Sequence, residues 1–255
     1  MKRQTLYLGT SGWSYKDWQG PFYPQEMNSK NYLNHYAMHF DAVEIDSTFY
    51  GIPRRSTVEN WRDQTPAHFI FSPKVPQMIT HEKRLDNCEA EWKQFIAHMQ
   101  ILGDKLGPVV LQFDYQFTFK DHFEMLSRFL KQYSADCRLC VEIRNRDWHN
   151  EAFYKLLKDH QTALVLNDLY YMPRVQRITA GFTYIRLLGN RRQIPDDFSH
   201  IRIDRDKDLD WWATLIDECL EKELEVYAYS NNRYQGHAPA TIRMLAERLK
   251  SPRNE

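Results

Sequence analysis

The stretch 139–150, LCVEIRNRDWHN, joins an apolar start to an acid and a base. Leu-Cys-Val is typical of a buried strand, and Glu142 and Arg144 follow it with one residue, Ile143, between them. Because side chains alternate along a strand, both charges lie on the same face. Charge on a buried face is costly unless it is paired, so this face predicts an ion pair or a ligand site.

The same alternation of apolar positions with charged or polar ones recurs in four other apolar stretches. VEID carries Glu44 and Asp46, FIFSPK ends in Lys74, VVLQFD contains Gln112, and YIRLLG contains Arg186. With the first pair, these stretches supply three acids and three bases, so their charges cancel. Such groups must pair with each other or with a ligand.

Eight strand-like runs organise the chain, and most are followed by segments with helical periodicity. The runs are 5–12, 41–46, 68–74, 108–114, 138–145, 162–168, 182–189 and 224–232, and the clearest helical segments are 88–103, 121–133, 151–160, 208–222 and 239–250. No full helix is expected after the sixth run, where Pro173 interrupts the pattern. The alternation predicts a single-domain TIM-type (β/α)8 barrel of parallel strands over residues 1–250, with a frayed tail at 251–255. The alternative is an open doubly wound sheet, although no G-x-G-x-x-G follows the first run.

In such a barrel the apolar positions of each strand face the helices. If Val43, Ile45, Val141 and Ile143 face outward, the charged residues between them point inward, late in their strands. The carboxyl ends of barrel strands hold active sites, which predicts a ligand site there. Parity also places Tyr227, Tyr229 and Asn231 inside. The alternative is a sealed salt-bridge network, although barrels usually fill their interior with apolar side chains.

Loops after the strands add aromatic and basic groups. We expect stacking on a ligand, or a packed cap over the barrel, from the aromatic residues Trp13, Tyr15, Tyr50 and Trp148, and packing from Trp18 and Phe22. Loops after strands 7 and 8 of barrels often bind phosphate, and here they carry Arg191, Arg192 and Arg233 beside Asn231 and Asn232. The alternative is that these arginines are ordinary solvated residues.

The candidate acid/base residues are Glu142, Glu44, Lys74, Asp168 at the end of strand 6, and His81 after strand 3. Histidine titrates near neutral pH, although a lone loop histidine is more often structural. A metal could be drawn from the acids and His81, but no spacing requires one, and three bases in the same interior oppose a cation. Cys137 and Cys140 form C-x-x-C, the pattern of a redox pair or of half a metal site. No second such pair exists, and a metal site needs three or four ligands. The sequence does not identify a cofactor.

Bulk composition narrows the classes of function. The 255 residues contain 34 Lys and Arg against 34 Asp and Glu, so a broad basic field for nucleic acid is not expected. No apolar run is long enough to span a bilayer, and the start lacks the apolar core of a signal peptide, which predicts a cytoplasmic protein.

The motifs together resemble the domain-of-unknown-function-72 family, also called YecE-like. The pieces are GTSGWSYKDWQGPFYP, VEIDSTFYGIP, FSPKVPQMITHEKRL, LGPVVLQF, VEIRNRDW, YIRLLG and NNRYQGHAPA, in order from residue 9 to about 240. The resemblance implies a TIM-type barrel, and nuclease-like or DNA-binding roles have been suggested for the family. Residues that depart from its usual pattern are Asp46, Asn145, Leu188 and Arg233, which removes two histidines and one acid from the expected site.

Three functions fit these residues. The first is an enzyme performing acid/base chemistry on an anionic small molecule such as a phosphorylated sugar, with Glu142 as acid or base and Lys74, Arg144 and Arg186 holding the anion. The second is a nucleic-acid-binding or nuclease-like protein. The third is a non-catalytic binding protein whose inner charges form a closed network.

Overall fold

A computed structural model describes residues 5–249 of the chain, so the predicted frayed tail at 251–255 lies outside the described residues. All eight predicted runs contain strands. These are β1 (Leu6–Ser11), β2 (Ala42–Ile45), β3 (Ile70–Pro73), β4 (Val109–Gln112), β5 (Leu139–Glu142), β6 (Ala163–Leu169), β7 (Phe182–Gly189) and β8 (Glu225–Ser230).

The strands form one parallel sheet that is nearly closed into a barrel. Its order is β3-β2-β1-β8-β7-β6-β5-β4, and every ladder in it is parallel. The two edge strands meet through isolated bridges only, with Gly107 N–H donating to Phe71 O at 2.8 Å and Val75 N–H to Val110 O at 2.9 Å. The predicted TIM-type barrel is therefore confirmed, and the open doubly wound sheet is not formed.

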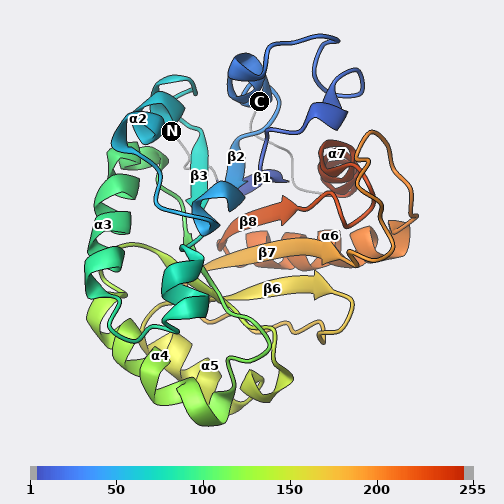
Figure 1. Ribbon diagram of the computed structural model, residues 1–255. Helices are drawn as coiled ribbons and strands as arrows, with labels where there is room; N and C mark the ends of the chain where they lie inside the picture. Colours follow the sequence, from blue (N-terminus) through green and yellow to red (C-terminus); the bar gives the residue numbers. More distant parts are fainter. Residues whose placement is uncertain (1–4, 250–255) are drawn as a thin grey trace.

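Helices cover the outside of the barrel, and Figure 1 shows α2 to α5 following one another around it. The helices are α1 (Tyr32–Tyr36), α2 (Arg55–Asp63), α3 (Glu89–Met99), α4 (Phe119–Tyr133), α5 (Glu151–Asp159), α6 (Asp206–Glu221) and α7 (Ala238–Arg248). Side chains fix several starts: Thr118 and Asn150 accept hydrogen bonds from backbone N–H groups in the first turns of α4 and α5. As expected, β6 connects to β7 without a helix.

Side-chain alternation divides the buried residues into two groups. Val43, Ile45, Val141 and Ile143 lie in the larger apolar core between strands and helices. The barrel interior holds a smaller cluster that includes Tyr7, Ala42, Val110, Cys140, Val165, Tyr184, Tyr227 and Tyr229. The lower interior is thus filled with tyrosine rings; Tyr7 and Tyr227 stack with their centroids 4.7 Å apart. The polar residues begin above this layer, toward the carboxyl ends of the strands.

No helix in residues 5–249 is long and apolar enough to cross a membrane.

Candidate functional site

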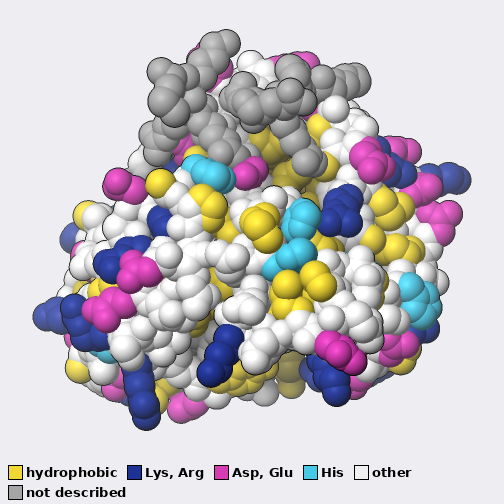
Figure 2. Space-filling view, turned by 90° about the horizontal axis from the view of Figure 1, so that it is seen from above, with side chains coloured by type: hydrophobic (Ala, Val, Ile, Leu, Met, Phe, Trp, Pro, Cys, Tyr) yellow, Lys and Arg dark blue, Asp and Glu magenta, His cyan; other side chains and the backbone are white. Residues whose placement is uncertain are grey.

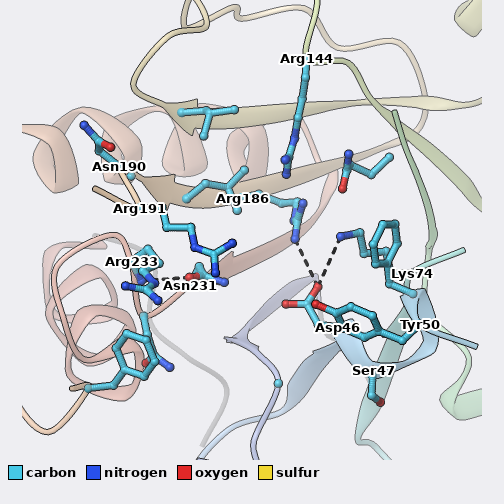
Figure 3. Close-up of a pocket in the computed structure, with 18 of the residues that line it drawn as sticks. Asp46, Ser47, Tyr50, Lys74, Arg144, Arg186, Asn190, Arg191, Asn231 and Arg233 are labelled. Atoms are coloured by element: carbon cyan, nitrogen blue, oxygen red, sulfur yellow. Dashed lines mark hydrogen bonds and ion pairs between the residues drawn. The ribbon is translucent and has the colours of Figure 1, made fainter. Parts of the chain in front are cut away.

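A cavity of about 1040 Å³ opens at the carboxyl ends of the strands (Figure 3). Each of the eight strands contributes its last residue or one of the next two to the lining: Gly12, Asp46, Lys74, Gln112, Arg144, Leu169, Gly189 and Asn231. The barrel mouth is therefore not sealed by a plug of side chains. Cations predominate in the lining, with Lys74, Arg144, Arg186, Arg191, Arg192 and Arg233 against Asp46 and Asp114.

Arg186 on β7 lies at the floor of the cavity and contacts three carboxylates there. Its guanidinium is almost fully buried and donates to Glu142 Oε2 through Nη1 and to Glu44 Oε1 through Nη2, the latter at 2.7 Å. Asp46 Oδ1 lies 3.6 Å from the same Nη2. Carboxylates from β5, from β2 and from the turn after β2 thus converge on one guanidinium, which donates a hydrogen bond to each of the two glutamates.

The two buried glutamates differ in their electrostatics. Burial opposes ionisation of Glu142, but Arg186 and Arg144 outweigh it and lower its pKa to about 2; Arg144 Nε donates to its Oε1 at 2.8 Å. Burial raises the pKa of Glu44, against the opposing effect of Arg186 and with the help of nearby Asp46. Ser11 and Tyr184 hydroxyls each donate to Glu44 at 2.8 Å. Both glutamates lie beneath the cavity and reach it only through the arginines.

Lys74 stands beside Asp46 at the cavity wall. It follows β3, is 8 % exposed, and places Nζ 3.8 Å from Asp46 Oδ1 and 4.1 Å from the centre of the Phe49 ring. Burial lowers the pKa of Lys74, Asp46 opposes that effect, and Arg186 and Arg144 add to it. Figure 3 shows Lys74 and Arg186 both directed at the Asp46 carboxylate.

His81 lines the same wall, in a single π-helical turn, Met78–Glu82. Its Nδ1 is 2.8 Å from the Thr80 hydroxyl, its Nε2 is 3.5 Å from Gln112 Nε2, and its ring contacts Phe49 edge-on. Burial lowers the pKa of His81. Burial thus favours the neutral imidazole, which lines the cavity.

The opposite side of the cavity holds the basic loops. Arg191 and Arg192 are exposed, while Arg233 is held by Ile194 O and Asp196, with its guanidinium 4.8 Å from the Phe198 ring centre. Figure 3 shows Arg191, Arg233 and Asn231 across the cavity from Lys74. Asn232 lines the cavity but is buried, and its Oδ1 accepts from Trp18 Nε1 and Ala238 N. Asn232 thus ties the first loop to α7.

The aromatic candidates separate into two groups. Trp13, Tyr15 and Tyr50 line the cavity, and Tyr50 is 77 % exposed. Trp148 does not: it is fully buried, stacks on Phe117 and donates from Nε1 to Phe117 O. Trp18 and Phe22 pack against each other, as expected for them.

Asp168 also lies outside the lining. Its Oδ2 accepts hydrogen bonds from Arg174 Nη2 at 2.8 Å, Trp212 Nε1 at 3.0 Å and Tyr234 OH at 2.9 Å. These partners anchor the β6 end to α6 and to the loop after β8. A carboxylate with three donors on one oxygen is a structural anchor rather than a group poised at the cavity.

Several lining residues were not among the sequence candidates. Asp114, Tyr170 and Tyr171 follow β4 and β6, and Phe198 comes from the loop after β7. The position of the first three at or just after the ends of predicted strands was a usable signal. Phe198 lies nine residues beyond β7, and nothing in the local pattern marks it.

Neither metal nor disulfide chemistry is built from the described residues. In residues 5–249, no group of three or more His, Cys, Asp or Glu side chains is placed to hold a metal ion. Cys137 and Cys140 are free thiols, and burial raises the pKa of Cys137 to about 12.

A single parallel (β/α)8 barrel with an open, polar cavity at the carboxyl ends of its strands defines a TIM-type barrel protein. Residues 7–255 match the family model "Protein of unknown function DUF72", and the chain belongs to that family.

Two proteins of known sequence are similar to this chain. "UPF0759 protein YunF" of Bacillus subtilis is 27 % identical over 269 residues, covering 96 % of this chain and 94 % of that protein. "UPF0759 protein YecE" of Escherichia coli K12 is 29 % identical over 140 residues, covering 55 % of this chain and 48 % of YecE. These names carry no substrate or reaction.

Solved structures give the same fold. A DUF72 family protein from Thermotoga maritima has a TM-score of 0.82 at 23 % identity, covering 97 % of this chain and all of that one. One from Enterococcus faecalis has a TM-score of 0.78 at 21 % identity, covering 98 % and 97 %.

Proposed function

We propose that this protein is an enzyme that performs acid/base chemistry on an anionic, phosphate-bearing small molecule in the cavity at the strand ends. The observation that carries the proposal is the charge of the lining, with six cationic side chains against two carboxylates. An excess of fixed cations in a concave site attracts and orients an anion. The cavity has room for a metabolite of this kind.

The burial of each group suggests its role. Glu142 is ionised and shielded, so it serves the reaction by holding Arg186 and Arg144 rather than by exchanging a proton. Glu44 holds Arg186 from the other side. Lys74 and Asp46 line the cavity in contact range of each other, and this pair supplies the acid and the base. His81 is a second proton carrier on the same wall.

Anion binding is tested by isothermal titration calorimetry with inorganic pyrophosphate, followed by a thermal-shift panel of phosphorylated metabolites. The variant Arg191→Gln/Arg192→Gln removes two exposed charges from the rim and should weaken pyrophosphate binding by about tenfold or more, since charged hydrogen bonds are worth roughly 1.5–3 kcal/mol each. Arg128→Gln, on the exposed side of α4, is the matched control and should bind like the parent. Equal affinity in all three proteins, or no binding in the parent, contradicts the proposal.

A nucleic-acid-binding or nuclease-like role is the second candidate. It is favoured by Tyr50, Tyr115 and Tyr170, whose rings are exposed and could stack on bases. Against it, the face drawn in Figure 2 has basic and acidic side chains interspersed rather than a basic stripe. A non-catalytic binding protein would use the same cavity without turnover.

A further inference from the structure

We propose that Lys74 is a nucleophile that forms an imine with the carbonyl group of an anionic aldehyde or ketone bound in the cavity. The inference rests on the proposed function, because the anion-binding side chains bring the substrate to the lysine. It narrows the substrate class from anions in general to carbonyl compounds that carry a phosphate or carboxylate.

The position of Lys74 is fixed by its backbone. The Thr48 hydroxyl donates to Lys74 O at 2.7 Å, and Lys74 N–H donates to Thr48 Oγ1 at 3.1 Å and lies 3.3 Å from Ile45 O. This clamp joins the end of β3 to the turn after β2. The backbone of Lys74 is thereby anchored at the cavity wall, which fixes the point from which its side chain extends.

The ammonium group lacks the close partner that a structural lysine has. Its distance of 3.8 Å to Asp46 Oδ1 is too long for a hydrogen bond, although both groups line the cavity. Lys105, a structural lysine of the same chain, donates to Thr65 O at 2.6 Å and to its hydroxyl at 3.1 Å. The gap at Lys74 leaves Nζ room to change partner.

The surroundings favour the neutral amine, which is the nucleophilic form. Lys74 is buried, one face of its head group lies on the Phe49 ring, and two arginines line the same cavity. Burial and the nearby guanidiniums lower the pKa of Lys74, against the opposing charge of Asp46.

The reaction balances with the groups present. The Lys74 nitrogen lone pair attacks the carbonyl carbon, a C–N bond forms, and the C=O π pair moves to oxygen. Asp46 carries one N–H proton to that alkoxide, and Arg144 stabilises the charge before the proton arrives. The nitrogen lone pair then expels hydroxide, which takes up the second N–H proton and leaves as water. Imine and water are the only products, and nothing is oxidised or reduced.

The test uses pyridoxal 5′-phosphate, an aldehyde that carries a phosphate. The intact protein is incubated with it, sodium borohydride is added at intervals to convert imine to a stable secondary amine, and peptide mass spectrometry measures labelling at each lysine. Lys155, whose side chain is 75 % exposed on α5, is the internal reference. Lys74 should be labelled faster than Lys155, because burial and the nearby guanidiniums raise the neutral fraction of its amine.

Variants and a second probe distinguish a failure of the Lys74 nucleophile from a failure of the anion site. Lys74→Arg should abolish the fast phase of labelling, whereas Lys155→Arg should retain both the fast phase and pyrophosphate binding. Asp46→Asn should move the pH profile of labelling to lower pH, because it removes the charge that opposes the pKa lowering.

Labelling of Lys74 no faster than Lys155, with pyrophosphate still bound, overturns the imine and leaves the proposed function standing. Pyridoxal without phosphate should label Lys74 more slowly. If it labels Lys74 equally fast and pyrophosphate does not bind, the anion site is overturned and the nucleophile stands.

Discussion

At the scale of single residues, Glu44 and Glu142 show how two equally buried carboxylates come to have pKa values shifted in opposite directions. Both lie beneath the cavity and bind Arg186, but only Glu142 also binds Arg144. At Glu142, Arg186 together with Arg144 outweighs burial and lowers the pKa. At Glu44, burial and the nearby Asp46 outweigh Arg186 and raise the pKa. A lowered folded-state pKa means that Glu142 stabilises the fold above its unfolded pKa and loses that contribution as the pH falls toward about 2.

We therefore expect Glu142→Gln to cost about 3 kcal/mol in the free energy of unfolding near pH 7, the value of a pKa lowered from 4.5 to about 2. The cost should shrink as the pH is lowered from about 5 to about 3, because the parent loses the same contribution. Glu44→Gln, the matched control, should cost less at neutral pH, since the raised pKa makes its ionised form unfavourable in the fold. Urea denaturation across that range measures both; equal costs for the two variants would contradict this account.

At the scale of elements, the barrel has one weak joint, between β3 and β4. Seven neighbouring strand pairs form ladders, whereas these two strands meet through isolated bridges near Gly107 and Val75. Gly107 fits there because a Cβ would lie 2.5 Å from Ile70 Cγ2 and 2.9 Å from Ser72 Oγ. Lys74 belongs to this joint through its bridge to Val110, so the geometry of the joint affects the cavity wall.

Gly107→Ala should accordingly destabilise the barrel by about 1–3 kcal/mol, the usual range for an added methyl group in a packed position. Gly181→Ala is the control, because a Cβ there meets nothing within 4 Å. It should be neutral or slightly stabilising through the lower entropy of the unfolded chain. Thermal unfolding and hydrogen exchange at the Gly107 and Val75 amides are the measurements. If the Gly107→Ala protein is as stable as the Gly181→Ala protein, the strands at this joint accommodate the added methyl group without loss of stability, and the prediction is wrong.

Sequence periodicity was enough for the elements and for the direction of their side chains. The alternation in VEID and VEIR placed Glu44 and Glu142 in the interior, because an apolar helix-facing side leaves no other place for them. It could not place Trp148 or Asp168, because their surroundings come from distant segments: Phe117 for one, Trp212 and Tyr234 for the other. Strand ends were predictable, and the partners they find across loops were not.

At the scale of the whole molecule, the charges are sorted between the cavity and the rest of the chain. The chain has 34 basic and 34 acidic residues, of which the lining holds six and two, leaving 28 basic against 32 acidic elsewhere. The charged residues outside the cavity are therefore net acidic. A small anion would be attracted mainly by the basic cavity, whereas a long polyanion would also be repelled by the net acidic residues outside it.

This sorting predicts how oligonucleotides bind, if they bind at all. Affinity for single-stranded thymidine oligonucleotides should stop rising with length after about three phosphates, because basic residues outnumber acidic ones in the cavity lining but not in the rest of the chain. The slope of log affinity against log salt should then be no steeper than about −2, at roughly 0.7 per phosphate. Fluorescence anisotropy with oligonucleotides of increasing length gives both quantities, and pyrophosphate should compete for the same site. An affinity that keeps rising with length, with a steepening slope and no competition, would place the strand along the outer surface. In that case Tyr50, Tyr115 and Tyr170 would mark a stacking path, and the nucleic-acid-binding function would replace the small-molecule one.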